Sequence, residues 1–118
     1  MRGYLIRTDG RRGFVDVGDW RGIAETLECD WVDVVRLEGG ADMFIDDEGL
    51  LTDRPLNYIA TVLAIEKGPI RTWLRGDVIV FGTHGDGGTE DVPEWVEKWV
   101  EELKRSIEPP EVTNATSN

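Results

Sequence analysis

Acidic and imidazole side chains are the groups in this chain best suited to chemistry. Asp46, Asp47 and Glu48 form a contiguous acidic run, and the only histidine, His84, stands two residues before Asp86. Carboxylates can bind a divalent cation, and a histidine beside an aspartate can act as an acid–base pair. One alternative is therefore a metal-dependent hydrolase or nuclease that uses Asp46, Asp47, Glu48 and His84.

Both groups are more typical of turns than of a catalytic site. Calcium loops alternate oxygen ligands with spacers, whereas contiguous acids direct their side chains apart. A zinc site needs three or four ligands, and the sequence offers only His84, Asp86 and Cys29. We therefore predict no catalytic residue, no metal and no cofactor, and we regard the acidic run, His84 and Asp86 as candidate contacts with a partner.

Five tryptophans form the second notable group. Tryptophan usually packs in the core, so core packing is the first expectation for all five. Trp95 and Trp99 stand one helical turn apart, and an apolar stripe wider than a small sheet can cover would be an interface. Trp95 and Trp99 are therefore candidate interaction residues, and a homodimer through this helix or its neighbours is one interpretation.

Length and composition restrict the class of protein. The chain has 118 residues with 24 acidic and 13 basic side chains, a net charge of −11. This predicts one domain, residues 1–107, followed by a disordered acidic tail at 108–118. The acid excess argues against direct binding of nucleic acid or anionic membranes. A single cysteine and the lack of an apolar run of about 20 residues suggest a cytoplasmic protein.

Turn signals and apolar periodicity predict the elements of the first half. Asp9-Gly10 tolerates positive φ and favours a hairpin of residues 3–6 with 13–17. Asp19 can cap a helix that ends near residue 29. Residues 31–37 are β-rich and mostly apolar, as in a central strand, and 41–46 form its hairpin partner. The apolar stripe of the helix consists of Trp20, Ile23, Ala24 and Leu27.

The second half predicts two helices and a strand. Pro55 favours the first turn of a helix that ends at Gly68-Pro69. Residues 77–82 read as a buried strand, and Asp91 with Glu94 has the spacing of a capping box for a C-terminal helix. The order β-β-α-β-β-α-β-α predicts an α+β fold: a small, mostly antiparallel sheet with about three helices on one side.

Four segments together match a known pattern: Trp31–Leu37, Ile45–Leu50, Pro55–Thr61 and Leu74–Gly82. They form a strand, an acidic turn ending in glycine, an Asn-x-x-Ala-Thr helix start and a Gly-Asp strand. In this order, over roughly residues 1–84, the chain resembles a small phage-associated family, the domain of unknown function DUF3846. The resemblance implies a phage or mobile-element origin, no assigned activity, and an Asn57 that ties the acidic turn to the helix.

The sequence therefore predicts a non-catalytic, phage-type accessory protein in the cytoplasm of a host cell. It would bind and modulate a host or phage protein through an acidic surface, in counter-defence or host takeover. Acidic stretches at 42–48 and 90–102 could supply that surface, whereas the acid excess is also typical of simple solubility or of the composition of the host. A second alternative is a protein that sequesters a small ligand such as a nucleotide. Its aromatic slot would combine Arg36, Arg71 or Arg75 with Trp31 or Trp73.

Overall fold

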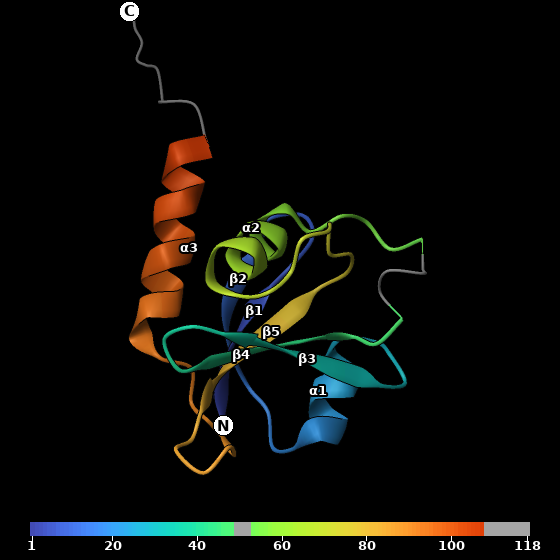
Figure 1. Cartoon of the computed structure of the whole chain (residues 1–118). Helices are drawn as coiled ribbons and strands as arrows, with labels where there is room; N and C mark the ends of the chain where they lie inside the picture. Colours follow the sequence, from blue (N-terminus) through green and yellow to red (C-terminus); the bar gives the residue numbers. More distant parts are fainter. Residues whose placement is uncertain (49–52, 108–118) are drawn as a thin grey trace, which may run out of the picture.

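Figure 1 shows the computed structural model of the chain, which describes residues 1–48 and 53–107. A six-stranded sheet forms its centre, in the order β2-β1-β5-β4-β3, with β6 paired to β5. The chain order β-β-α-β-β-α-β-β-α confirms the predicted α+β class and adds one short strand. The strands are β1 (Arg2–Ile6), β2 (Arg12–Asp16), β3 (Val32–Leu37), β4 (Ala41–Asp46), β5 (Val78–Thr83) and β6 (Thr89–Glu90), and the helices are α1 (Trp20–Thr26), α2 (Tyr58–Lys67) and α3 (Glu94–Ile107).

Two predictions concern parts of the chain outside the described residues. These are the end of the acidic motif at residues 49 and 50, and the tail at 108–118. Within the described ranges, no helix combines the length and apolar character needed to cross a bilayer.

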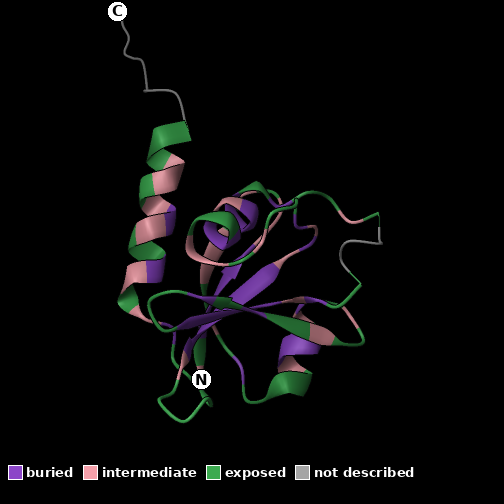
Figure 2. Ribbon diagram, viewed as in Figure 1, coloured by how far each residue is buried: buried purple, intermediate pink, exposed green. Residues whose placement is uncertain are grey.

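Both faces of the middle strands are apolar, and this decides where the helices pack. β5 and most of β1 and β4 are buried (Figure 2). One core, which includes Met43 and Val80, lies between the sheet and helices α2 and α3. A second core, which includes Phe44 and Phe81, lies on the opposite face with α1. The prediction that all helices lie on one side is therefore wrong, because strands that are apolar on both faces need cover on both.

β3 lies at the edge of the sheet, where the sequence predicted a central strand. Only two of its six residues, Val35 and Leu37, are buried, and Val34 is 39% exposed. Its main chain is partly protected. The Glu38 amide donates to the Lys67 carbonyl oxygen at 2.7 Å, and the Val34 amide donates to the Asp33 carboxylate at 2.8 Å. Such contacts occupy groups that would otherwise invite another strand.

Two helix starts differ from the predicted capping. Pro55 is not in the first turn of α2, because the helix begins at residue 58 with Asn57 as its N-cap. The capping box predicted at Asp91 is also wrong, because α3 begins only at residue 94. The Asp91 carboxylate instead accepts the amide of Arg2 at 2.8 Å. Asp91 therefore ties the segment before α3 to β1 rather than starting the helix.

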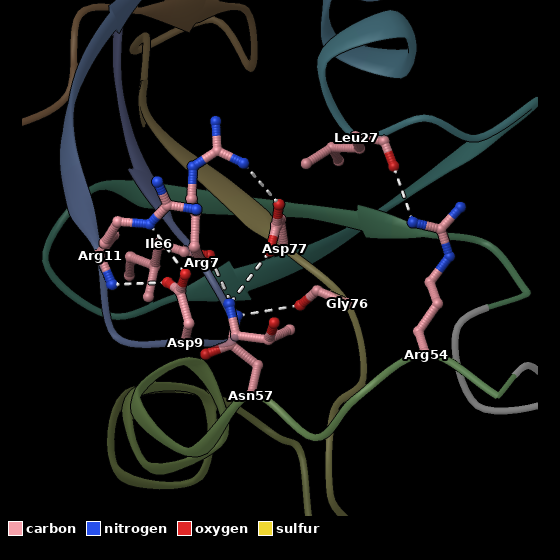
Figure 3. Close-up of polar contacts among 10 residues, drawn as sticks. Ile6, Arg7, Asp9, Arg11, Leu27, Arg54, Asn57, Gly76 and Asp77 are labelled. Carbon is pink, nitrogen blue, oxygen red and sulfur yellow. Dashed lines mark hydrogen bonds and ion pairs between the residues drawn. The ribbon is translucent and has the colours of Figure 1, made fainter.

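Asn57 is fully buried and joins three parts of the chain (Figure 3). Its side-chain nitrogen donates to the carbonyl oxygens of Ile6 at 3.0 Å and Gly76 at 2.9 Å. Its side-chain oxygen accepts the Ala60 amide at 3.1 Å, which caps α2. These bonds remove the penalty of burying a polar group. Asn57 thus ties the start of α2 to the end of β1 and to the turn before β5. It makes no bond to Asp46, Asp47 or Glu48, the described part of the acidic turn that the resemblance implied.

The end of α1 holds a glutamate in a backbone conformation that favours glycine. Glu28 has φ of 56°, the one positive φ at a non-glycine residue in the described part of the chain. Its amide donates to the Glu25 carbonyl at 3.1 Å, and the Cys29 amide donates to the Ala24 carbonyl at 3.0 Å. This pair of bonds is the Schellman motif. A side chain at its left-handed position introduces strain.

We expect the amide of Asn57 to be a major source of stability. Asn57→Ala should lower the free energy of unfolding by about 3 kcal/mol, because three backbone groups lose a buried partner. Asn57→Asp keeps the cap but turns a carboxylate oxygen toward two carbonyl oxygens. Burial and these oxygens raise the pKa of the introduced carboxyl group. The loss in free energy of unfolding of Asn57→Asp should therefore be smallest below about pH 4, where the protonated carboxyl group can donate a hydrogen bond. This loss should grow as pH rises.

Urea denaturation at pH 7 and at about pH 4 measures both effects. Asp19 is the matched control, because its carboxylate caps α1 through the Gly22 amide at 3.0 Å but lies at an exposed site. Asp19→Ala should cost only about 1 kcal/mol. Equal losses for the two alanine variants would contradict a special role for Asn57.

Glu28→Gly should stabilise the protein. Relief of the left-handed strain should raise the free energy of unfolding by up to about 1 kcal/mol. The greater backbone entropy of glycine in the unfolded chain offsets part of this gain. Glu25→Gly, at an exposed position inside the same helix, should instead lower it by about 1 kcal/mol. Thermal unfolding followed by circular dichroism compares the two. A loss of stability in both variants would show that Glu28 is not strained.

Candidate functional site

The seven candidate residues do not form one site, because they lie at opposite ends of the sheet. β4 and β5 run antiparallel, with Phe44 opposite Ile79. The acidic turn at 46–48 follows the end of β4 and so lies near the start of β5. His84 follows the end of β5 and lies near the start of β4. The acids and the histidine of the hydrolase alternative are therefore kept apart by the length of the sheet.

Within the acidic turn, Asp46 is buried and serves the turn itself. Its carboxylate accepts the amide of Glu48 at 3.0 Å and pairs with the Arg54 guanidinium at 3.0 Å. The side chains of Asp47 and Glu48 are exposed. In the part of the chain that the structure describes, no group of three or more His, Cys, Asp or Glu side chains is placed to hold a metal ion.

His84 and Asp86 pair with each other in an exposed loop between β5 and β6. The Nδ1 atom of His84 lies 2.9 Å from Asp86 Oδ1, and that oxygen also accepts the Gly88 amide at 2.9 Å. The hydrogen bond from Gly88, followed by that of His84, lowers the pKa of the Asp86 carboxyl group. The His84 amide closes the same turn by donating to the Gly88 carbonyl at 2.7 Å. This pair therefore stabilises its own loop.

Trp95 and Trp99 are half-buried on α3 and line a groove of about 420 Å³. The indole nitrogen of Trp95 donates to the Gly39 carbonyl at 2.8 Å, and that of Trp99 lies 3.4 Å from a carboxylate oxygen of Glu66. Gly39 has φ of +84°, and a Cβ there would lie 2.9 Å from Trp95 Nε1, so the contact requires glycine. The remaining lining residues are Glu38, Lys67, Lys98 and Glu102.

The most exposed tryptophans were expected in the core. Trp20, Trp31 and Trp73 are 50%, 66% and 50% exposed, so that expectation is wrong for these three. Trp20 and Trp31 stack with ring centroids 6.1 Å apart, and Trp73 lies 6.2 Å from the ring of Tyr58. The only sequence signal for their exposure is position, since each stands at the start of an element or in a connection beside charged residues.

An ion pair fixes α3 against the first hairpin. Both oxygens of the Glu101 carboxylate accept from Arg12, at 2.6 Å and 2.7 Å, and the Tyr4 hydroxyl donates to Glu101 at 3.2 Å. Hydrogen bonds from Arg12 are the main reason that the pKa of Glu101 lies below its usual range. Burial, reinforced by Glu101, raises the pKa of Tyr4 to about 12. This contact determines how α3 presents its tryptophans and its acidic side chains.

The sequence model of a family described as a domain of unknown function (DUF3846) matches residues 1–104. The chain belongs to the DUF3846 family. No curated protein and no solved structure shows a significant match to it. The match confirms the resemblance and extends it beyond residue 84 into α3, so the helix that carries Trp95 and Trp99 is part of the family domain.

In this DUF3846 chain, the motifs of the resemblance hold the fold. The Thr61 hydroxyl donates to the Asn57 carbonyl at 2.7 Å and accepts the Leu74 amide at 2.9 Å. Asp77 of the Gly-Asp motif accepts the Thr8 amide at 3.0 Å and pairs with Arg7 at 3.1 Å. The pattern therefore marks structural contacts, and the candidate interaction residues must be judged from the surface.

We expect the Arg12–Glu101 pair to make stability depend on pH. Because the pKa of Glu101 is lowered on folding, its contribution is present above about pH 4.3 and is lost as pH falls through the lower folded value. The Glu101 side chain is 40% exposed, so solvent screens the pair. Glu101→Gln should therefore cost about 1 kcal/mol at pH 7.

Denaturation from pH 7 to about pH 3 tests this expectation, and the difference from the wild type should close at the acidic end. Glu97→Gln, on the exposed face of the same helix, is the control and should change stability by less than about 0.5 kcal/mol. A Glu101→Gln cost that stays constant across this range would contradict the ionic origin.

Proposed function

We propose that this DUF3846 protein is a non-catalytic, phage-type accessory protein that binds a basic surface of a host or phage protein and modulates it by occlusion. The observation that carries the proposal is the α3 surface. We define this surface as the groove at Trp95 and Trp99 together with exposed carboxylates of α3 and of the preceding strand β6. These carboxylates are Glu90, Glu94, Glu97 and Glu102.

Charge supports a basic partner. Residues 84–107 contain seven carboxylates against three basic side chains, in a chain whose net charge is −11. Such a field accelerates encounter with a positively charged surface and disfavours anionic partners. Glu94 and Glu97 lie in the first turn of α3, where the helix dipole stabilises negative charge. These carboxylates therefore stabilise the helix as well as contributing to the acidic surface.

The groove supports a contact with another protein. Both indole nitrogens are directed at groups of the protein itself, which leaves apolar ring surface facing the groove. A half-buried tryptophan beside a polar rim is typical of the centre of a protein–protein interface. Trp95 and Trp99 would therefore supply the apolar anchor, and the carboxylates would orient the partner.

The proposed phage origin rests on the resemblance to a phage-associated family, and a cytoplasmic location in a host cell follows from that origin. The hydrolase alternative would need residues that this fold places at opposite ends of the sheet. The nucleotide alternative combines Arg36, Arg71 or Arg75 with Trp31 or Trp73, and none of these described residues is among those that line the α3 groove.

Affinity capture from a lysate of the native host tests the proposed function. The immobilised wild-type protein should retain a basic protein that about 1 M salt releases, because salt screens the ionic contact. Glu94→Lys, Glu97→Lys and Glu102→Lys in one chain should reduce recovery of that protein at least about tenfold, as judged by quantitative mass spectrometry.

The matched control carries the same change of net charge elsewhere: Asp9→Lys, Asp16→Lys and Glu25→Lys, all at exposed positions. It should retain the partner. The proposal fails if the wild type retains no protein that salt can release, or if the α3 variant and the control recover the same proteins in equal amount.

A further inference from the structure

The end of the sheet opposite the His84 loop carries two exposed aromatic pairs. The start of β3 pairs with the end of β4 at Val32 and Asp46, and the end of β1 pairs with the start of β5 at Ile6 and Val78. Trp31 immediately precedes β3, and Trp73 stands five residues before β5. The Trp20–Trp31 stack and the Tyr58–Trp73 pair therefore lie at the same end.

The first pair lies among carboxylates. Trp31 lines a small pocket of about 160 Å³ together with Glu28, Asp30 and Glu48. Its ring is parallel to that of Trp20, with an interplanar angle of 5°, and its side chain is the most exposed of the tryptophans. We name this group the acidic aromatic patch. It consists of Trp20, Glu28, Asp30, Trp31 and Glu48.

The second pair lies beside an arginine. Leu56 and Arg75 form an antiparallel bridge, which places Tyr58 opposite Trp73. Asn57 and Leu74, between them, point inward and are buried, so the alternating side chains point outward. Leu56, Tyr58 and Trp73 are accordingly 42%, 46% and 50% exposed. We name this group the basic aromatic patch. It consists of Leu56, Tyr58, Trp73 and Arg75.

Arg75 gives the basic aromatic patch a positive charge. Its guanidinium donates to the carbonyl oxygen of Arg54 at 3.0 Å. Among residues 1–48 and 53–107, Arg75 has no carboxylate within ion-pair distance. A backbone carbonyl therefore positions this guanidinium group without neutralising it.

Arg54 joins the two patches. Its guanidinium donates to the Leu27 carbonyl at 2.9 Å (Figure 3). The same guanidinium pairs with Asp46 at 3.0 Å, and the Arg54 carbonyl oxygen accepts the bond from Arg75. Leu27 immediately precedes Glu28 of the acidic aromatic patch, and Asp46 lines its pocket. The two patches of opposite charge therefore flank one residue.

We propose that these patches form a self-complementary surface, on which a second copy of the chain docks as a two-fold dimer. A two-fold axis near Arg54 would place the acidic aromatic patch of each copy on the basic aromatic patch of the other, so that every favourable contact forms twice. Tryptophan, tyrosine and arginine are the residues that dominate binding energy in protein interfaces. Local charge pairing offsets the repulsion between two chains of net charge −11.

Reversing the charges of one patch at a time tests this arrangement. By sedimentation equilibrium, the wild type should be dimeric at about 100 µM. The double variant Asp30→Arg, Glu48→Arg should be monomeric, because both contacts in its homodimer become repulsive. The variant Arg75→Glu should be monomeric for the same reason. An equimolar mixture of the two should form a heterodimer, because both of its contacts again join opposite charges.

The α3 surface supplies the matched control. The double variant Glu94→Arg, Glu97→Arg should remain dimeric, and circular dichroism should show that every variant is folded. A monomeric wild type at about 100 µM overturns the proposal. So does a dimer that survives reversal of either patch, or a mixture that fails to form the heterodimer. A dimer broken only by the α3 variant would place the interface on α3, and none of these results depends on the partner captured through the α3 surface.

Discussion

One buried amide side chain sets the arrangement at the end of the sheet. Asn57 makes three hydrogen bonds to main-chain groups of β1, of α2 and of the turn before β5. Because the interior offers no water, each of these groups needs that partner. The same constraint turns Asn57 and Leu74 inward, and the alternation of side chains then turns Tyr58 and Trp73 outward. The hydrogen bonds of Asn57 that stabilise the fold thus also determine that Tyr58 and Trp73 are exposed to solvent.

Several acidic residues that could have taken part in catalysis or metal binding instead form hydrogen bonds that stabilise the fold. Asp46 and Asp86 each accept a backbone amide within their own turn, and Asp91 accepts the amide of Arg2. A carboxylate that accepts amide bonds is an ordinary way to stabilise a tight turn. The exposed acids of α3 and those beside Trp31 lie at opposite ends of the sheet, and other exposed acids such as Asp9, Asp16 and Glu25 are spread over the surface. Their separation favours recognition of other proteins over a shared catalytic centre.

The two surfaces differ in how their charge is organised. On α3, exposed carboxylates accompany a groove with two half-buried tryptophans, and Lys67 and Lys98 also line that groove. At the other end, an acidic and a basic group of residues flank Arg54, which suits a surface of the same kind. Net charge alone does not show this difference, because −11 describes the whole chain and not the positions of its arginines. The Arg12–Glu101 pair holds α3 against the first hairpin.

The sequence by itself determined the elements and the α+β class, because turn residues, caps and apolar periodicity act over a few neighbours. Asp9-Gly10, the Asp19 cap and the apolar stripe of α3 are examples. The order of the strands and the faces that the helices cover were decided only in the tertiary structure. Hydrogen bonds between distant strands place β3 at the edge of the sheet, and apolar packing places α1 on the second face. Exposure of Trp20, Trp31 and Trp73 follows from that placement. Residue type gives the apolar area of a side chain, but the packing of distant segments decides whether it is covered.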